Sequence, residues 1–329
     1  FTPTEVGHSK YVSMSVRTIS QLGLQKSSAK ILPAGSILLS SRATVGECSI
    51  AQKDCTTNQG FQNLIPKKGI NNEFLYYLAQ TQKRHFIKYA SGSTFLEISN
   101  SEIKKTKCAV PGIKEQTEIA TFLSAIDKKI ETQNKIISKY ETLIKGIRER
   151  IVNCGWQWKK LDELIQEGVV RLNRGNIIPK HPKDNTYKYP VYSSSTQNNG
   201  LMGYNDTYMF DKELITWSID GGGNFFYRKK HKFNVTNVCG IMQVDENVYS
   251  YRFIAEMLIY QHSKMKFDYQ SKAHPSVISS LYSLPCLHIS EQNFYCQLFI
   301  VLDKKMHIEQ CSLNKLKEQK KYLLSKMFI

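Results

Sequence analysis

The sequence predicts an α/β (α+β) chain in which two globular domains alternate with two long helices that form an antiparallel coiled coil. Three observations support this prediction: a heptad pattern in residues 115–151, a second heptad pattern in residues 291–329, and a matching order of turns and short strands before each. The chain has 329 residues, which is enough for two ordinary domains and the elements that connect them.

The first heptad pattern has apolar residues alternately four and three positions apart, which is typical of the a/d seam of a coiled coil. Its seam residues are Ile119, Leu123, Ile126, Ile130, Ile137, Tyr140, Ile144 and Ile147. The polar residue Gln133 occupies one d position. A helix of this length would run roughly 55 Å, and its single apolar stripe requires a second helix to cover it.

The same registers recur 176 residues later. The second seam contains Phe299, Leu302, Met306, Leu313, Leu316 and Leu323. Glu309 stands where the first helix has Gln133, and Lys320 interrupts the seam. Matched registers in one chain predict an intramolecular pair of helices, although helices alone could serve only to hold domains together.

The segments before the two helices also match. Ile37 to Ser41 corresponds to Leu214 to Ser218, and Thr57-Asn58-Gln59-Gly60 corresponds to Thr236-Asn237-Val238-Cys239-Gly240. The sequence therefore predicts domains at 1–114 and 154–288, and spacer helices at 115–153 and 289–329. The counterpart of residues 158–178 is absent from the first copy, so we expect the first domain to be incomplete at its N-terminus.

Turn residues and apolar runs predict the elements inside each copy. The first copy is expected to have strands at 36–41 and 47–51, a helix at 72–89, and a turn and strand at 98–110. The second is expected to repeat this plan, with a helix start at 158–165, a strand at 214–218 and a helix at 250–267.

The composition is strongly basic, with 45 Lys and Arg, 28 Asp and Glu, and a formal net charge of +17. Such a balance favours a nucleic acid as partner, with a generally basic protein as the alternative. Eight cysteines without Cys-x-x-Cys spacing indicate reduced thiols, as in a cytoplasmic protein, and no metal site. The sequence begins without a basic-then-apolar run and has no apolar run of about 18 residues, so we expect neither a signal peptide nor a membrane span.

The order of these motifs, twice over and each time followed by a heptad helix, resembles the specificity subunit of type I restriction–modification systems. The motifs that carry the resemblance are Gly35 to Gly46, Thr57 to Gly60, Glu115-Gln116, Trp158 to Leu161, Tyr189 to Tyr192, Asp220 to Gly222, Thr236 to Gly240 and Leu324 to Phe328. The resemblance covers the whole chain. It implies two target-recognition domains that each bind one half of a split double-stranded DNA sequence, with the helices as spacer. It also implies docking of two methyltransferase subunits, and of restriction/translocase subunits in the full complex.

The sequence contains no catalytic constellation, which agrees with a non-enzymatic specificity subunit. We find neither a Phe-x-Gly-x-Gly cofactor loop nor an Asn/Asp-Pro-Pro-Tyr/Phe motif, and no phosphate loop of the Gly-x-x-x-x-Gly-Lys-Ser/Thr type. Gly221 to Gly223 follows an apolar strand but lacks the spacing of a nucleotide cradle, so we expect no cofactor. Two alternatives remain: an unrecognised nuclease on the same repeat, and a silent or inactive specificity cassette.

DNA binding requires cations for phosphates and polar side chains for base edges. The candidate phosphate contacts are Lys83, Arg84, Lys88, Arg228, Lys229, Lys230 and Lys232. The candidate base contacts are Arg42, Thr44, Thr57, Asn58 and Gln59 in the first domain, and Ser193, Ser194, Ser195, Gln197, Asn198, Asn224, Asn237 and Lys272 in the second.

The Thr-Asn pairs and the run from Ser193 to Asn199 differ in how strongly they indicate a base contact. The Thr-Asn pairs recur in both copies, so they could be structural turn caps, because residues that contact bases should differ between the copies. The run from Ser193 to Asn199 has no counterpart in the first copy and is the better candidate. The outer faces of the long helices mix Lys with Glu, which favours a protein dock or solvent over a phosphate track.

Overall fold

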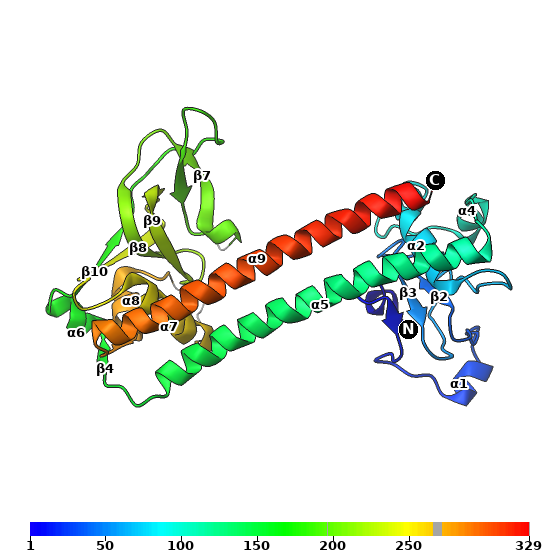
Figure 1. The fold of residues 1–329 in the computed structure, drawn as a ribbon, viewed down its shortest axis with the longest axis horizontal. Helices are drawn as coiled ribbons and strands as arrows, with labels where there is room; N and C mark the ends of the chain where they lie inside the picture. Colours follow the sequence, from blue (N-terminus) through cyan, green and yellow to red (C-terminus); the bar gives the residue numbers. More distant parts are fainter. Residues whose placement is uncertain (196, 266–271, 329) are drawn as a thin grey trace. The chain divides into compact units, whose positions relative to one another are not determined.

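The chain divides into two units in the computed structural model, which describes residues 1–195, 197–265 and 272–328. Unit 1 comprises residues 1–135 and 310–329, and unit 2 comprises residues 136–309. Each unit therefore contains one globular part and a portion of both long helices, α5 (Ile113–Val152) and α9 (Ile289–Met327). In both units the two helices run antiparallel (Figure 1), which confirms the predicted coiled-coil fold.

Unit 1 has a small sheet covered by helices. Its elements before α5 are η1 (Pro3–Glu5), β1 (Tyr11–Val12), α1 (Gln21–Gln25), β2 (Ile37–Leu39), β3 (Cys48–Ala51), α2 (Asn72–Thr81), α3 (Lys83–Lys88) and α4 (Asn100–Lys105). Among its described residues the sheet has three strands in the order β1-β3-β2, with β1 parallel and β2 antiparallel to β3. Helix α2 packs on β2 and β3 and carries Phe74 into a core shared with Ile119 and Leu123 of α5.

Unit 2 has a larger sheet. Its elements between the long helices are β4 (Trp158–Lys160), α6 (Leu161–Gln166), β5 (Val170–Arg174), β6 (Tyr189–Tyr192), η2 (Gln197–Gly200), β7 (Leu201–Asn205), β8 (Phe210–Ser218), β9 (Phe225–Val235), β10 (Cys239–Val244), α7 (Tyr251–Lys264), α8 (Pro275–Leu281) and β11 (Ser283–Pro285). In the described part of this unit, six strands pair in the order β5-β10-β8-β9-β6-β7, and β11 pairs with β4.

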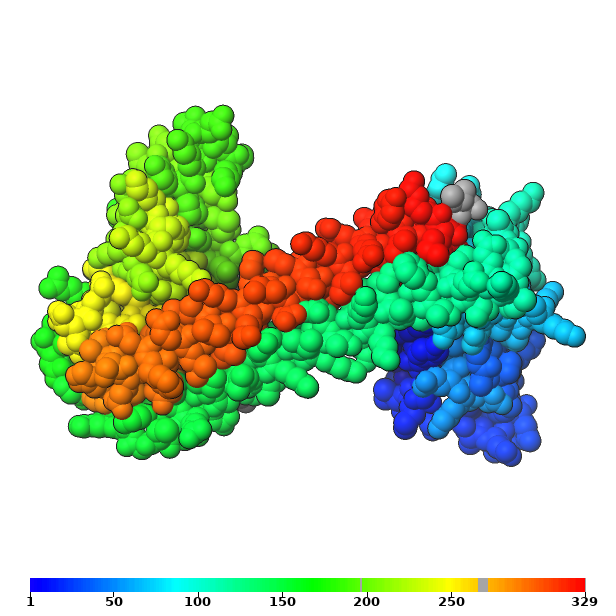
Figure 2. Space-filling model, viewed as in Figure 1, coloured from blue at the N-terminus to red at the C-terminus, as the bar shows by residue number. Residues whose placement is uncertain are grey.

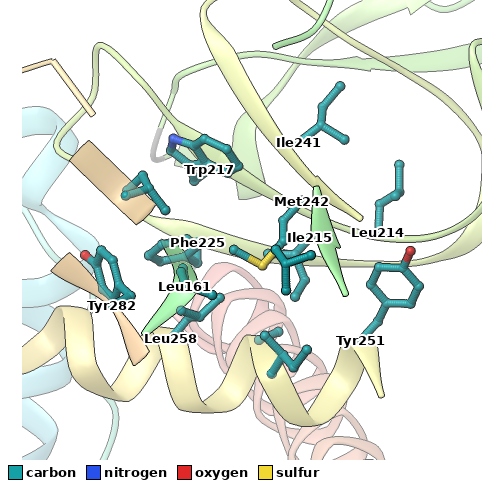
Figure 3. Packing of buried hydrophobic residues seen from close by; sticks show 14 of the residues in the cluster. Leu161, Leu214, Ile215, Trp217, Phe225, Ile241, Met242, Tyr251, Leu258 and Tyr282 are labelled. Carbon is teal, nitrogen blue, oxygen red and sulfur yellow. The ribbon is translucent and has the colours of Figure 1, made fainter. Parts of the chain in front are cut away.

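The core of unit 2 lies between this sheet and helix α7. Figure 3 shows Trp217, Phe225 and Ile241 from the sheet together with Leu258 of α7 and Tyr282. Gly240 pairs with Trp217 in the β8–β10 ladder, and a Cβ on Gly240 would lie 1.9 Å from the Trp217 ring. The glycine that ends the Thr-Asn-Val-Cys-Gly motif is therefore required by packing of the tryptophan.

The long helices pack on the globular parts in the same way in both units. In unit 2, Phe253 and Met257 of α7 share a cluster with Ile144 of α5 and with Phe299 and Leu302 of α9. In unit 1, Phe74 of α2 has the equivalent position, and its ring centroid lies 5.2 Å from that of Phe328 at the end of α9. All the predicted seam residues are buried or half-buried.

Lys320, which interrupts the second seam, is compensated by an acidic partner. Its Nζ lies 2.7 Å from Asp127 Oδ1 on α5, and both side chains are mostly buried. Asp303, the counterpart of Asp127 in the second repeat, binds Arg252 of α7 at 2.9 Å. A cation on a seam position is tolerated because an opposite charge and not apolar surface faces it.

Two predicted elements differ from the structure. The segment at 98–110 was expected to be a turn and strand, but α4 occupies part of it, because Ser99 Oγ caps the helix by accepting a hydrogen bond from Glu102 N at 3.2 Å. The residues Trp158–Lys160 were expected to start a helix, but they form β4 because they pair with β11, a partner more than 120 residues later.

The helix predicted at 72–89 is interrupted. Helices α2 and α3 meet at Gln82, which ends α2 with φ −82° and ψ −4°. The expected inward residues Phe74, Leu78 and Phe86 are nevertheless buried. The end of the helix predicted at 250–267 and residue Ser271 lie outside the described residues.

Candidate functional site

Hydrogen bonds join three loops of unit 2 into one cluster. We call it loop cluster 2 and define it as residues 193–200, 219–224 and 236–238. Ser218 Oγ donates a hydrogen bond to Ser194 O at 2.7 Å, and Thr236 Oγ1 donates to Ser193 Oγ at 2.9 Å. The third link is Ile219 N to Val238 O at 3.1 Å. The structure therefore gathers candidate base contacts from three separate chain segments.

The candidate residues of loop cluster 2 differ in exposure. Gln197, Asn198 and Asn237 are exposed, whereas Ser194, Ser195 and Asn224 are half-buried and Ser193 is buried. Ser193 and Asn224 also use their side chains inside the cluster, because Asn224 Nδ2 donates to Gly221 O at 3.2 Å. Residue 196 of the predicted run lies outside the described residues. Gln197, Asn198 and Asn237 are thus the side chains best placed to meet a ligand.

The backbone of the 193–200 loop adopts an uncommon conformation. Asn198, Asn199 and Gly200 all have positive φ, at 48°, 52° and 80°. Side chains rarely adopt this left-handed region, and asparagine and glycine are the residues that tolerate it best. The amide of Ser193 closes the loop by donating to Gly200 O at 2.8 Å.

Arg228 departs from the expectation of an exposed phosphate contact. It is only 4% exposed and donates through Nε to Thr216 Oγ1 at 2.9 Å and through Nη1 to Asn199 O at 2.7 Å. The prediction grouped it with Lys229 and Lys230 as a phosphate contact, but it lies on strand β9, where alternate residues point to opposite faces. In this structure Arg228 is buried beside the 193–200 loop and donates a hydrogen bond to its backbone.

The neighbouring cations of unit 2 remain on the surface. Lys229, Lys230 and Lys232 are exposed, and the Nζ of Lys232 lies 4.7 Å from the centre of the Tyr208 ring. Lys272 is exposed and lies 3.5 Å from Asp220 in loop 219–224. Lys272 thus brings a positive charge to loop cluster 2, and Lys229 and Lys230 directly follow Arg228, which contacts Asn199 of that cluster. A polyanion would require such cations.

Unit 1 has an equivalent cluster, loop cluster 1, formed by residues 42–47, 57–60 and 91–97. Ser41 N donates to Gly60 O at 2.9 Å and Ala43 N donates to Leu96 O at 3.1 Å, so the three loops are held together. Arg42 and Gln59 are exposed. The Nε of Arg42 lies 3.7 Å from Glu97, an ion pair in which both side chains are about half exposed.

Three candidate residues of loop cluster 1 have structural partners. Thr44 Oγ1 donates to Pro3 O at 3.2 Å, and Asn58 Oδ1 accepts a hydrogen bond from Gly60 N at 3.0 Å. The second contact is an Asx turn, which supports the interpretation of the Thr-Asn pair as a turn cap. Thr57 Oγ1 likewise accepts from Asn63 Nδ2 at 2.8 Å.

A groove of about 760 Å³ in unit 1 brings the predicted cations of α3 together with cations of α9. Lys83 and Arg84 line it with Lys317, Lys320 and Lys321, and Ile87 provides apolar surface. Lys83 also pairs with Glu47 of loop cluster 1, while Arg84 and Lys88 are exposed. The α9 lysines were missed because the sequence alone does not indicate that this part of α9 lies beside α3.

Phe95 was also missed. It is 57% exposed in loop 91–97, next to Leu96 at 45%, and its ring centroid lies 6.0 Å from the Arg42 guanidinium. A single aromatic residue in a loop of small residues carries no periodic signal, so sequence reasoning could assign it only to a loop.

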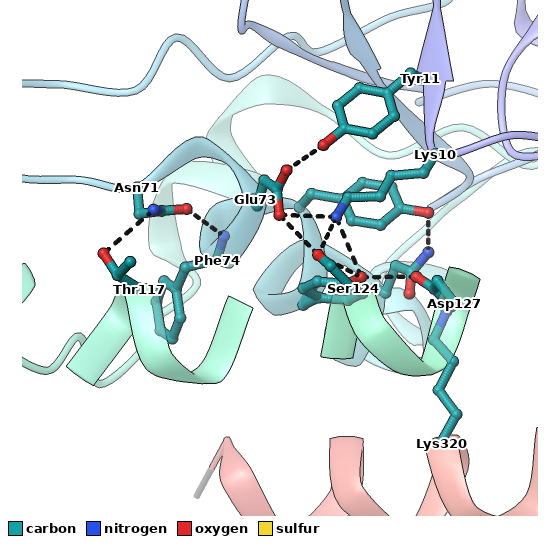
Figure 4. A network of polar contacts seen from close by, with 12 residues as sticks. Lys10, Tyr11, Asn71, Glu73, Phe74, Thr117, Ser124, Asp127 and Lys320 are labelled. Atoms are coloured by element: carbon teal, nitrogen blue, oxygen red, sulfur yellow. Dashed lines mark hydrogen bonds and ion pairs between the residues drawn. The ribbon is translucent and has the colours of Figure 1, made fainter. Parts of the chain in front are cut away.

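A polar network anchors the sheet and α2 of unit 1 to α5 (Figure 4). Lys10 Nζ lies 3.0 Å from Glu73 Oε2 and donates to Ser124 Oγ at 2.5 Å, and Tyr77 OH donates to Asp127 Oδ2 at 2.7 Å. Burial and the bond to Asp127 raise the pKa of Tyr77. Burial opposes ionisation of Glu73, but hydrogen bonds from Tyr11, Ser124 and Lys10 lower its pKa overall. Tyr77 therefore stays neutral and Glu73 stays ionised near neutral pH, as an anchor requires.

The described residues contain no arrangement typical of catalysis by a metal ion. No group of three or more His, Cys, Asp and Glu side chains among them could hold a metal ion. Burial raises the pKa of Cys48 and Cys239 to about 12, so neither thiol is a reactive thiolate near neutral pH. None of the helices in the described ranges has the length and apolarity needed to cross a bilayer.

Comparison with known proteins gives one consistent result. The family model for the type I restriction modification DNA specificity domain matches residues 2–142 and 153–281. The chain is 40% identical over 190 residues to the MjaIX type I restriction enzyme specificity subunit of Methanocaldococcus jannaschii, covering 50% of this chain and 44% of that one. It is 36% identical over 132 residues to a putative type I specificity subunit of Mycoplasma pneumoniae, covering 38% of this chain and 42% of that one. The chain thus spans less than half the length of these two relatives.

The fold has also been seen in a solved structure. The crystal structure of the S subunit of a type I restriction–modification system from M. genitalium matches with a TM-score of 0.65 at 18% identity. The match covers 98% of this chain and 89% of that one. The tandem arrangement of mixed helix-and-sheet parts and long helices is therefore a fold that this S subunit shares.

Proposed function

The chain belongs to the type I restriction modification DNA specificity domain family, and we propose that it reads a split double-stranded DNA target for a restriction–modification complex. In this proposal the globular parts of residues 1–114 and 154–288 each bind one half of the target. The chain has no catalytic role of its own, and methylation and cleavage belong to its partner subunits.

The observation that carries this proposal is the pair of loop clusters. In each unit, exposed polar side chains from separate segments are gathered in one place, and a lysine pairs with an acidic residue of the loops, Lys83 with Glu47 in unit 1 and Lys272 with Asp220 in unit 2. Base edges are read by such side chains, while cations bind phosphates and set the register on the duplex. In loop cluster 2 we assign base reading to Gln197, Asn198 and Asn237, and phosphate binding to Lys229 and Lys230.

The partners that we propose bind the long helices. Methyltransferase subunits, one for each unit, would dock on the outer faces of α5 and α9, and restriction subunits would join the assembled complex. Support comes from the exposed face of the first half of α9, orange in Figure 2, which no other part of unit 2 covers in that view.

The test is to co-express the chain with the methyltransferase subunit encoded beside it and to map methylated bases across a genome by single-molecule sequencing. A split motif with a fixed gap is the expected result. One half-site alone would indicate that the first globular part does not read DNA. A stable complex without any motif would favour the silent cassette. Magnesium-dependent cleavage by the purified chain alone would favour the nuclease.

A further inference from the structure

Arg228 carries a positive charge into the interior of unit 2. Within the described residues no carboxylate forms an ion pair with it, and its buried Nη2 has no hydrogen-bond partner. Its neighbours are the Thr216 hydroxyl, the Asn199 carbonyl and the rings of Tyr192 and Phe226, whose centres lie 3.7 and 4.9 Å from the guanidinium carbon. Burial lowers the pKa of Arg228 to about 10, so the side chain stays charged at neutral pH.

Such a residue is costly for stability. A buried cation loses its hydration, and well-packed apolar side chains of similar volume often serve a core as well or better. Two hydrogen bonds to neutral groups and two contacts with aromatic rings recover only part of that loss. The position of Arg228 therefore calls for an explanation other than stability of the fold.

The contact with Asn199 suggests that explanation. Arg228 holds the carbonyl of Asn199 at the point where the backbone is left-handed over three successive residues. Gly200 completes the arrangement, because a Cβ there would lie 2.9 Å from Ser193 O and 3.2 Å from Arg228 Nη2. The guanidinium thus fills the space under the loop, and the loop geometry and the arginine depend on each other.

We propose that Arg228 is a positioning residue that fixes the 193–200 loop and so determines the sequence specificity of the second globular part without touching a base. The inference rests on the proposed function. The guanidinium reaches the Asn199 carbonyl and the Thr216 hydroxyl with two different nitrogens, and a lysine ammonium, a single donor centre on a flexible stem, cannot reproduce that geometry. Its charge also gives the underside of the loop a positive potential.

The test compares Arg228→Met and Arg228→Lys with Lys230→Met, a change at an exposed cation on the same strand. The first measurement uses the full chain without DNA. In both Arg228 variants, amide hydrogen exchange at Ser193 and in residues 197–200 is expected to rise about tenfold, the effect of losing one hydrogen bond. Exchange in α7 and the urea midpoint of unit 2 should stay close to the wild type, because the core of the unit does not depend on the cation.

The second measurement maps methylation in the co-expressed complex. Both Arg228 variants should accept additional bases in one half-site only, while the other half-site stays strict. Lys230→Met should instead weaken binding evenly for all sequences and reduce its salt dependence.

The outcomes separate the positioning role from the proposed function. Unchanged loop exchange in both Arg228 variants would overturn the positioning role, whatever the methylation map shows. Faster loop exchange with an unaltered motif would overturn the link to specificity. If the wild-type complex gives no motif, the proposed function fails, yet the exchange experiment still tests whether Arg228 holds the loop. If Arg228→Met fails to fold, Arg228→Lys provides both measurements, and global unfolding of both variants would contradict the inference.

Discussion

Two buried glutamines show how the repeat is built at the scale of single residues. Gln116 accepts a hydrogen bond from Asn71 N at 2.9 Å and donates to Gly69 O and Pro111 O at 3.1 and 2.8 Å. Gln292, 176 positions later, accepts from Ser250 N at 3.0 Å and donates to Val248 O and Leu287 O at 2.8 and 3.0 Å. Each side chain fastens the start of a long helix to the turn before α2 or α7.

We therefore predict that Gln292→Leu destabilises unit 2 by about 3 kcal/mol, since three backbone groups lose the hydrogen bonds of the glutamine side chain. Gln297→Leu, at an exposed position of the same helix, is the control and should change stability by less than about 0.5 kcal/mol. Urea unfolding followed by circular dichroism measures both. Equal midpoints for the two variants would show that water or a local rearrangement replaces the lost bonds.

His262 makes the stability of unit 2 depend on pH. Its Nδ1 lies 2.7 Å from Tyr282 OH, and burial lowers its pKa below the ordinary value of 6.5. The unfolded chain therefore binds a proton at higher pH than the folded chain does. This contribution to stability is complete above pH 6.5 and is lost as the pH falls toward the folded pKa.

We expect the urea midpoint of unit 2 to decrease as the pH is lowered from 7 through 6, and His262→Gln to reduce that dependence. His288→Gln, at an exposed histidine, should leave the dependence intact. A pH profile that is the same in wild type and His262→Gln would assign the effect to other groups.

The residues predicted for the candidate site differ in whether the structure leaves them exposed. Five candidate side chains are exposed, as contact with a base requires, although their contact with DNA stays a prediction. They are Arg42, Gln59, Gln197, Asn198 and Asn237. The burial of Arg228 could not be predicted from the sequence. Which residue in a run of cations is buried depends on the face of the strand that it occupies and on the partner strand. Phe95 and the α9 lysines could not be found, because their significance comes only from neighbours distant in sequence.

At the scale of elements, the long helices were predictable to within about two residues, since heptad periodicity persists over many turns. The repeat also located β2, β3, α2 and α7. The sheet of unit 2 was underestimated: β7 and β9 lie among polar and basic residues, and their pairing is set by long-range contacts that leave no local pattern. The second copy therefore repeats the plan of the first on a larger sheet.

Helix α9 also differs from α5 on its outer face. Phe294, Val301 and Ile308 are 68%, 47% and 64% exposed and stand seven residues apart, so they form one stripe on the unit 2 part of α9. The residues 176 positions earlier on α5 are Glu118, Ala125 and Thr132. Exposed apolar stripes of this kind are typical of protein interfaces.

If this face docks a methyltransferase subunit, the triple variant Phe294→Glu, Val301→Ala and Ile308→Thr, which gives α9 the residues of α5, should weaken that association at least about tenfold. Its stability should change little because all three side chains are exposed. Lys304→Gln, at a neighbouring exposed position, is the control. Binding to the purified methyltransferase subunit can be measured by calorimetry, and unaltered affinity in the triple variant would place the dock elsewhere.

At the scale of the whole molecule, the tandem repeat predicts that the two halves of recognition are separable. The globular part of unit 2 has its own core, whose members among the described residues lie between Leu161 and Leu284. Its contacts with the long helices are confined mainly to α7, where Arg252 binds Asp303, Glu256 binds Arg148, and Phe253 and Met257 pack on both helices. A replacement domain needs equivalents of these four α7 residues in order to dock.

We predict that exchanging residues 154–288 for the corresponding domain of a homologue, with those α7 contacts retained, changes one half-site of the methylated motif and preserves the other. The gap between the half-sites should also persist, because α5 and α9 keep their length and their seam. Single-molecule sequencing of the chimera beside the parent measures both properties in one experiment. The substitution Arg252→Glu in the chimera should weaken docking of the globular part on α9, because it would place a carboxylate against Asp303. If both half-sites change together, the two globular parts do not bind one half-site each, and the proposal of two separate recognition domains is wrong.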